Sequence, residues 1–265
     1  MKIWAVANQK GGVGKTTTAV NLAGQLVLQQ QRVLLVDMDP HGSMTSYFGQ
    51  DPDALEKSIY QLFQVPAVDL KQTAEGILLP TGVNGLSLLP ASTAMATIDR
   101  QLGTQKGKGL VLKQALQTLA ERFDHVLIDC PPLLGILMVN ALAACEHLIL
   151  PVQTEFLALK GLERMMHTLG MIIKSRKGEL DYTIVATMFD RRTRAAQDSL
   201  EMLQQLYREY LAKTIIPIDT QFREASRRGQ PLTTMQPKSR GALAYADLLN
   251  ELQQSRVAPL RLVSS

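Results

Sequence analysis

The sequence predicts an α/β fold in which a doubly wound, mostly parallel sheet is flanked by helices on both faces. Apolar runs rich in Val, Ile and Leu recur at 3–7, 32–37, 125–129 and 147–151. Stretches with apolar residues at helical spacing separate these runs. Strands that are apolar on both sides are typical of parallel sheets buried between two helical layers.

The first half of the chain supplies the first strands and one insertion. Residues 3–7 form a short buried strand, a glycine-rich loop follows, and a helix then covers 18–28. The run 32–37 is the second strand and ends in a carboxylate. Residues 50–84, rich in Asp, Gln, Pro and Gly, are interpreted as short helices and loops inserted after it.

The second half continues the alternation. We expect helices at 162–173 and 199–211, with strands at 182–188 and 214–218. A final helix is predicted from an apolar stripe that consists of Ala242, Tyr245, Leu248, Leu249 and Leu252.

Composition places the chain among ordinary globular proteins. Its 265 residues are 46% hydrophobic, which suffices for one large domain over 1–255 with a loose tail at 256–265. The first residues lack the features of a secretory signal, and the longest apolar stretch, 133–145, is too short to cross a bilayer of about 30 Å. Because the features of a secretory signal are lacking, we expect a cytoplasmic protein. Only Cys130 and Cys145 are present, so we expect neither disulfides nor a zinc site. The net charge of +4 permits binding to a polyanion without demanding it.

A phosphate-binding motif stands between the first predicted strand and the helix that follows it. Its residues are Lys10, Gly11, Gly12, Val13, Gly14, Lys15, Thr16 and Thr17. Glycines in such a loop allow backbone N–H groups to converge on a β-phosphate at the helix N-terminus. Lys15 would add charge toward the β and γ oxygens, and Thr16 a hydroxyl ligand for Mg²⁺. A glycine-rich turn that only precedes a helix is the alternative, which this order of Gly, Lys and Thr disfavours.

Three carboxylates follow predicted strands. Asp37 and Asp39 end the second strand, and Asp129 ends the strand at 125–129. Open parallel sheets bind ligands at the carboxyl ends of their strands. A strand-end cap is the alternative for each aspartate alone, but three of them beside one phosphate loop favour a shared magnesium site. None of the four histidines forms a catalytic pair, and His41 is interpreted as a residue of the loop after Asp39.

The glycine-rich loop departs from the common phosphate-binding pattern and resembles that of the ParA/MinD family of deviant P-loop ATPases. Gln9 stands where the common pattern has glycine, and Lys10 precedes the paired glycines. The resemblance extends to the final predicted helix. It implies a slow, partner-stimulated ATPase that uses ATP and Mg²⁺ and forms a homodimer when ATP is bound. Lys15 would act in cis and Lys10 would reach the partner's nucleotide in trans, with a solvated loop cation as the alternative for Lys10.

The same resemblance implies roles for further residues. Asp39 would orient the attacking water, Asp37 would lie near the hydrated magnesium, and Asp129 would hold Mg²⁺ mostly through water. The segments 40–43 and 131–135 would be switches that sense the γ-phosphate. The residues implied for an adenine pocket are Met188, Pro217 and Asp219.

Within that family the chain is most similar to short ParA-like proteins without an N-terminal DNA-reading domain. The segments that carry this similarity are 7–10, 37–40, 151–155 and 237–241. The tail 257–265 contains a proline and one cation, so we expect no direct membrane anchor of the MinD type.

Chromosome-partition members of this group bind DNA without sequence preference through basic residues near the C-terminal helices. Such binding is salt-sensitive, because it neutralises phosphates. The candidate DNA-binding residues here are Arg192, Arg194, Arg223, Arg227, Arg228, Lys238 and Arg240. A family arginine is replaced by Gln221, and a solvated basic face is the alternative.

Two segments, 189–194 and 217–226, look most like ParA-like proteins that accompany bacterial chemotaxis systems. We therefore expect a spatial-positioning switch that localises chemotaxis arrays at a cell pole with a protein adaptor or cargo partner. The alternative is chromosome or plasmid partition on nucleoid DNA with a centromere-binding partner. Two other functions fit less well: a metabolic relative would present a cysteine pair for a metal cluster, and a non-hydrolysing scaffold would lack Lys10 or Asp39.

Overall fold

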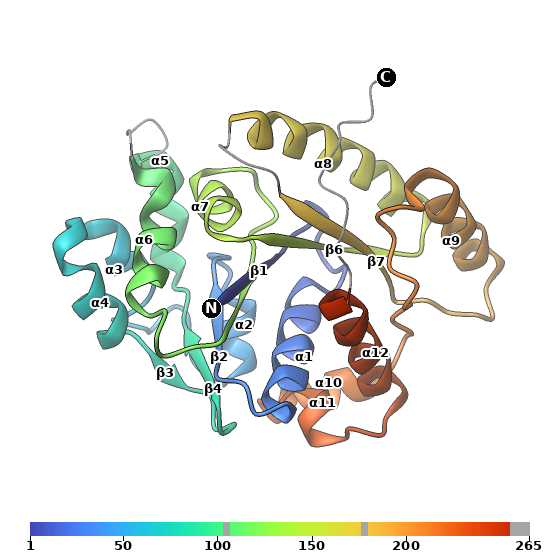
Figure 1. Cartoon of the computed structure of the whole chain (residues 1–265), viewed down its shortest axis with the longest axis horizontal. Helices are drawn as coiled ribbons and strands as arrows, with labels where there is room; N and C mark the ends of the chain where they lie inside the picture. The colour runs from blue at the N-terminus through green and yellow to red at the C-terminus, as the bar shows by residue number, and fades with distance from the viewer. Residues whose placement is uncertain (103–106, 176–179, 255–265) are drawn as a thin grey trace.

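A seven-stranded sheet forms the centre of the molecule, in the order β3-β4-β2-β5-β1-β6-β7 (Figure 1). The structure, a computed structural model, describes residues 1–102, 107–175 and 180–254. All neighbouring strands are parallel except β3 and β4. The strands are β1 (Lys2–Val6), β2 (Val33–Asp37), β3 (Leu79–Pro80), β4 (Leu86–Leu89), β5 (His125–Asp129), β6 (His147–Gln153) and β7 (Asp181–Thr187). The predicted doubly wound, mostly parallel sheet is confirmed.

Helices cover both faces of this sheet (Figure 1). One layer consists of α1 (Lys15–Leu28), α2 (Ser43–Tyr47), α10 (Gln221–Arg227), α11 (Leu232–Met235) and α12 (Arg240–Gln254). The other consists of α3 (Tyr60–Gln64), α4 (Leu70–Gly76), α5 (Ile98–Leu102), α6 (Val111–Thr118), α7 (Ile136–Ala144), α8 (Phe156–Ser175) and α9 (Arg194–Tyr207). Short 3-10 helices lie at Ala67–Asp69, Thr93–Thr97 and Lys108–Leu110.

Alternate residues of the central strands pack into the two layers. Val36 and Ile128 belong to the core beneath α3 to α9, whereas Leu35 and Leu127 pack with residues of α1 and α12. All four side chains are fully buried. Because successive strand residues point to opposite faces, burial on both sides requires continuous apolar runs. This requirement explains why the sequence showed runs and not alternation.

Strand register brings the ends of three strands together. Asp37 of β2 and Asp129 of β5 are direct partners in the parallel ladder. On the other side of β5, Val6 at the end of β1 is also paired with Asp129. The chain leaves β1 at this point and enters the glycine-rich loop before α1. The loop and the two carboxylates therefore share one edge of the sheet.

The strand predicted at 214–218 is wrong. This segment follows the outer edge of β7 but makes isolated bridges only, between Ile184 and Leu211 and between Phe189 and Pro217. Ile216 donates its N–H to the Ala186 carbonyl at 2.9 Å. Pro217 has no N–H, so the ladder cannot continue through it. The segment covers the sheet edge without becoming a strand.

Other element boundaries differ in informative ways. The helix expected at 199–211 is α9, which begins at Arg194 and ends at Tyr207. Its first turn is mostly exposed and therefore carries little apolar periodicity. Likewise, α8 begins at Phe156 instead of 162. Strand β4 was not predicted, because it lies in a short segment next to the irregular insertion.

The remaining elements agree with the sequence. The insertion at 50–84 contains short helices and the two-residue strand β3, and the stripe at 242–252 is the buried face of α12. The tail at 256–265 lies outside the described residues. Among the residues that the structure describes, no helix is both long and apolar enough to span a bilayer.

Candidate functional site

The glycine-rich loop connects β1 to α1 and is held by hydrogen bonds to neighbouring strands. Asn8 donates from Nδ2 to the carbonyl of Pro151 at 2.8 Å and accepts the backbone N–H of Lys10 at 2.9 Å. Gly14, immediately before α1, has φ of 90°, a left-handed value that favours glycine. Val13 is buried, and its carbonyl accepts the Thr187 hydroxyl at 2.9 Å, which ties the loop to β7.

The two lysines of the loop have different surroundings. Lys15, at the first position of α1, is 9% exposed and donates from Nζ to the Lys10 carbonyl at 3.4 Å. The Lys10 ammonium instead forms an ion pair with Glu155, which follows β6. The Lys10 and Glu155 side chains remain 30% and 40% exposed. Lys15 therefore lies inside the loop, and Lys10 lies on its accessible rim.

Asp37 and Asp129 form a buried carboxylate pair beside the loop. Asp37 accepts the Thr45 N–H at 2.8 Å and the Thr45 hydroxyl at 2.7 Å. The Asp129 Oδ2 atom accepts the Thr16 hydroxyl at 2.5 Å. Its Oδ1 atom is buried and has no partner among the described residues. The Thr16 hydroxyl thus binds Asp129, while Thr45 holds the neighbouring Asp37 carboxylate.

Burial raises the pKa of both carboxyls. For Asp129 the pKa is raised by desolvation and then by the charge of Asp37, against the lowering effects of the Thr16 hydrogen bond and the Lys15 charge. Desolvation likewise raises the pKa of Asp37, although its hydrogen bonds from Thr45 oppose the shift. A divalent cation would relieve this repulsion and would satisfy the Asp129 oxygen that lacks a partner.

The donor set fits Mg²⁺ held largely through water. The described residues contain no group of three or more His, Cys, Asp or Glu side chains placed to hold a metal by themselves. Mg²⁺ usually retains several waters and binds through one or two carboxylates together with substrate phosphates. Thr16 and Asp129 would hold it, with Asp37 acting through water. The site therefore fits a phosphate-bound magnesium ion.

Asp39 occupies a tight turn after β2. Its Oδ1 atom accepts the backbone N–H of His41 at 3.1 Å and the His41 Nδ1 at 2.9 Å. Its carbonyl accepts the Gly42 N–H at 2.8 Å. The Asp39 side chain is 12% exposed and that of His41 80%. His41 thus lies in the predicted switch segment 40–43 but contacts the carboxylate directly.

The residues implied for an adenine pocket are divided between two places. Met188, with φ of 53°, lies beside the phosphate loop, since a Cβ at Gly14 would stand 3.8 Å from its Cε. Pro217 and Asp219 instead line a cavity of about 510 Å³ with Arg191, Arg192 and Arg240. The Asp219 carboxylate accepts backbone N–H groups of Gln221 at 3.0 Å and Gly241 at 2.9 Å. It therefore caps both α10 and α12.

Most candidate DNA-binding residues are already paired. Arg192 binds Asp190 through two side-chain hydrogen bonds, and Arg194 lies 3.8 Å from Asp198. Arg227 and Arg228 share Glu224, and Arg240 donates to the Ile218 carbonyl. Arg223 and Lys238 are exposed and have no ion pair within the described part of the chain. These two are the best placed to meet an external anion.

Helix α1 connects the phosphate loop to the C-terminal helices. The Thr18 hydroxyl bonds with that of Tyr245 at 2.9 Å, and Gln25 donates to the Ala242 carbonyl at 3.1 Å. Asn21 accepts the Thr233 N–H at 3.3 Å. No periodic pattern in the sequence predicts these contacts, nor the partners Thr45 and Glu155. Buried polar positions within an otherwise apolar helix are the one feature that marks them in retrospect.

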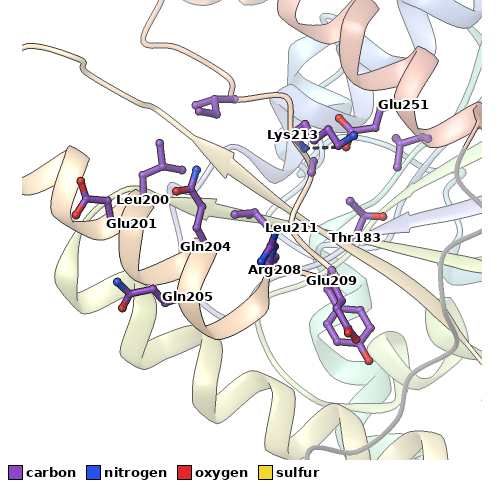
Figure 2. Close-up of a pocket in the computed structure, with 14 residues that line it drawn as sticks. Thr183, Leu200, Glu201, Gln204, Gln205, Arg208, Glu209, Leu211, Lys213 and Glu251 are labelled. Carbon is purple, nitrogen blue, oxygen red and sulfur yellow. Dashed lines mark hydrogen bonds between the residues drawn. The ribbon is translucent and has the colours of Figure 1, made fainter.

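A cavity of about 850 Å³ lies away from this site, between α9, α12 and the segment after α9 (Figure 2). Glu251 reaches toward Lys213 there and accepts the backbone N–H groups of Lys213 at 2.7 Å and Thr214 at 3.0 Å. None of the predicted site residues lines this cavity. Its size alone does not make it the functional site.

Relatives match nearly the whole chain. A family model described as an AAA domain matches residues 1–182. The sporulation initiation inhibitor protein Soj of Bacillus subtilis is 37% identical over 252 residues, which are 95% of this chain and 98% of Soj. The chromosome partitioning protein ParA of Myxococcus xanthus is 35% identical over 96% of this chain and 88% of that protein.

A solved structure has the same fold. The cobyrinic acid a,c-diamide synthase of Mycobacterium smegmatis, with an ATP analogue and magnesium bound, has a TM-score of 0.82 and 34% identity, covering 96% of this chain and 94% of that one. The matched regions include the phosphate loop and all three strand-end carboxylates. The chain therefore belongs to the ParA/Soj family of P-loop ATPases.

Proposed function

We propose that this protein is a partition-type positioning ATPase in which ATP joins two copies and hydrolysis separates them. The proposal depends on one observation. The phosphate loop, the Thr16 hydroxyl and the Asp37–Asp129 pair meet at the carboxyl ends of the central strands. Phosphoryl transfer needs this combination of anion binding, magnesium and positioned charge, and little else from the protein. Full-length relatives named for chromosome partitioning support the same conclusion.

In this proposal each loop residue has a part in binding or hydrolysis. Backbone N–H groups of residues 11–17 surround the phosphates, and Lys15 neutralises the β and γ oxygens. Thr16 and Asp129 hold the magnesium ion that ATP brings, with Asp37 as a partner through water. Asp39 orients the water that forms a bond to the γ-phosphorus as the bond to the β–γ bridging oxygen breaks.

Lys10 supplies the link between two copies. Its ammonium lies on the rim of the loop, and its ion pair with Glu155 is partly exposed. Replacing Glu155 as its partner by a more highly charged anion would therefore cost little free energy. A nucleotide phosphate from a second copy is such an anion. We therefore assign Lys10 a role in ATP-dependent dimerisation and not in ATP binding by the single chain.

A role in chromosome partition is better supported than a role in localising chemotaxis arrays. The chemotaxis interpretation depends on 189–194 and 217–226 alone, whereas three relatives that match nearly the whole chain are named as chromosome-partitioning proteins. We propose a cytoplasmic protein that works on nucleoid DNA with a DNA-bound adaptor as its stimulating partner. Polar chemotaxis arrays are the second candidate cargo.

A synthase function has less support. The similar Mycobacterium smegmatis protein is named a diamide synthase. If amide nitrogen came from glutamine, the chemistry would need a reactive thiolate. Both cysteines of this chain are buried, and burial raises the pKa of the Cys130 thiol. A positioning ATPase does not require either thiol.

Size-exclusion chromatography with light scattering on the Asp39→Ala variant tests the proposal. We expect a monomer with ADP, a dimer with ATP and co-elution of that dimer with duplex DNA. Lys15→Ala is the control for nucleotide binding and stays monomeric throughout. An ATP dimer that ignores DNA would favour the second candidate, and a monomer in every condition would overturn the proposed cycle.

A further inference from the structure

We propose that His41 is a positioning residue for ATP hydrolysis, because it holds the Asp39 carboxylate with one oxygen engaged and the other free for water. The inference rests on the proposed function, in which Asp39 orients the attacking water. The sequence marked His41 only as part of a loop. The structure gives it a direct contact with the carboxylate that the reaction depends on.

Both His41 donors converge on the same carboxylate oxygen. The backbone N–H and the ring Nδ1 lie 3.1 Å and 2.9 Å from Asp39 Oδ1. The backbone contact alone would leave the carboxylate free to rotate about its last torsion, which is a soft one. The ring contact adds a second direction of restraint. Together they fix which oxygen is used by the protein.

The second Asp39 oxygen is left available. Oδ2 makes no hydrogen bond with any described residue, and it is absent from the buried polar atoms that lack partners. It therefore retains contact with solvent. By contrast, Asp37 uses both of its oxygens on Thr45 and the Asp39 N–H. Of these two carboxylates at the end of β2, only Asp39 has an oxygen that no described residue engages.

The turn that carries His41 is fixed on both sides. Gly42 has φ of 61°, and a Cβ there would lie 2.3 Å from Pro52 Cγ, so another residue would displace the turn. Pro40 restricts the backbone before His41. After the turn, α2 brings Thr45 to Asp37. His41 is thus presented to Asp39 by a segment that is anchored to the second carboxylate.

Loss of the ring should affect turnover more than ATP binding. The His41 side chain is 80% exposed and makes neither a hydrogen bond nor an ion pair with the phosphate loop in the described part of the chain. Its removal leaves the backbone N–H contact and the turn in place. The carboxylate would then sample orientations in which the water is misplaced, and small errors in position cost one to two orders of magnitude in rate. We expect kcat to fall roughly tenfold with an unchanged affinity for ATP.

The test compares His41→Ala with His41→Asn. The Asn amide nitrogen can stand where Nδ1 stands, so His41→Asn should recover most of the wild-type kcat. Turnover is measured at saturating Mg²⁺ and ATP, and ATP affinity separately with a fluorescent N-methylanthraniloyl ATP. Ser46→Ala, an exposed change on α2 whose hydroxyl makes no hydrogen bond within the described residues, is the matched control.

The outcomes separate this inference from the proposed function. Reduced kcat in His41→Ala with recovery in His41→Asn supports it. Wild-type kcat in His41→Ala, or equal loss in both variants, overturns it even if Asp39→Ala is inactive. If the wild-type protein hydrolyses no ATP, the proposed function fails first. A higher kcat in His41→Ala would reverse the assignment and make His41 an inhibitor of Asp39.

Discussion

Asp129 combines two properties that conflict in the absence of a cation. It is 1% exposed, and one of its oxygens has no partner among the described residues. Its pKa is raised by burial and by the nearby charge of Asp37. A raised carboxyl pKa means that the folded state is favoured while the group is protonated and loses stability as pH rises through the folded value. Ionised Asp129 therefore destabilises the free protein.

Asp129→Asn should stabilise the protein without nucleotide while abolishing magnesium-dependent ATP hydrolysis. The amide keeps an oxygen that accepts the Thr16 hydroxyl but carries no charge to bury. We expect a gain of about 1 kcal/mol at pH 8, as found when functional sites are relieved of strain. Thermal unfolding without Mg²⁺ checks it. Asp247→Asn removes an exposed charge on α12 and should leave the melting temperature unchanged; equal gains in both would contradict the prediction.

His147 provides a titration with the opposite sign. Burial lowers its pKa from 6.5 to about 4, and its Nε2 lies 3.0 Å from the Thr183 hydroxyl. The contribution of neutral His147 to stability is therefore complete above a pH of about 6.5 and is lost as pH falls toward 4, by about 3 kcal/mol. His147→Gln should flatten this part of the stability curve.

Trp4 makes the His147 prediction measurable. It is the only tryptophan in the chain, and its ring centroid lies 6.2 Å from that of His147. Urea unfolding followed by Trp4 fluorescence at several pH values gives the stability of each variant. His167→Gln, an exposed histidine on α8, is the control and should retain the wild-type curve. An unchanged slope in His147→Gln would show that other groups cause the acid sensitivity.

At the scale of elements, close contact between α1 and α11 depends on a glycine. A Cβ at Gly24 would stand 2.2 Å from the Thr233 hydroxyl and 2.6 Å from Pro231 Cβ. The proline ring cannot move aside easily, so Gly24→Ala should cost about 1–3 kcal/mol in the free energy of unfolding. Gly161 in α8 has no atom within 4 Å of such a Cβ, and Gly161→Ala should add about 0.5–1 kcal/mol. Chemical denaturation of both variants checks the difference in sign.

The sequence specified buried elements better than edges. Central strands were recognisable because burial on both faces imposes continuous apolar runs, as at Leu35 and Leu127. The segment around Pro217 was misassigned, because its apolar residues cover a sheet edge that Pro217 cannot extend. Strand β4 was missed because four residues contain too little pattern to separate a strand from a loop.

The candidate site divides in the same way. The phosphate loop and the strand-end aspartates were predictable, since phosphate and magnesium demand those residue types at those positions. Their partners were not: His41, Thr45 and Glu155 meet the site through turns and through distant strands. Such contacts depend on three-dimensional packing and leave no local spacing to recognise.

For the whole molecule, one helix connects the phosphate loop to the C-terminal helices that carry the basic residues. Helix α1 begins at the phosphate loop and is hydrogen-bonded through Thr18, Asn21 and Gln25 to α11 and α12. Arg223 on α10 and Lys238 before α12 lie in this same layer, whereas α4 and α6 lie in the other (Figure 1). DNA bound at Arg223 and Lys238 would therefore contact the same helical layer as α1, whose N-terminus adjoins the phosphate loop.

Charge reversal in the two layers should have unequal effects on DNA binding. Arg223→Glu with Lys238→Glu removes exposed cations that have no ion pair among the described residues, so DNA affinity of the ATP-bound Asp39→Ala dimer should fall at least about tenfold. The slope of log K against log salt should become shallower by about 2, because each phosphate contact contributes about 0.9. Lys71→Glu with Lys113→Glu makes the same charge change on α4 and α6 and should alter neither quantity appreciably. Fluorescence anisotropy with a labelled duplex at several salt concentrations measures both. Equal losses in the two double variants would mean that net charge alone governs binding, and the C-terminal layer would then not be the DNA-binding surface.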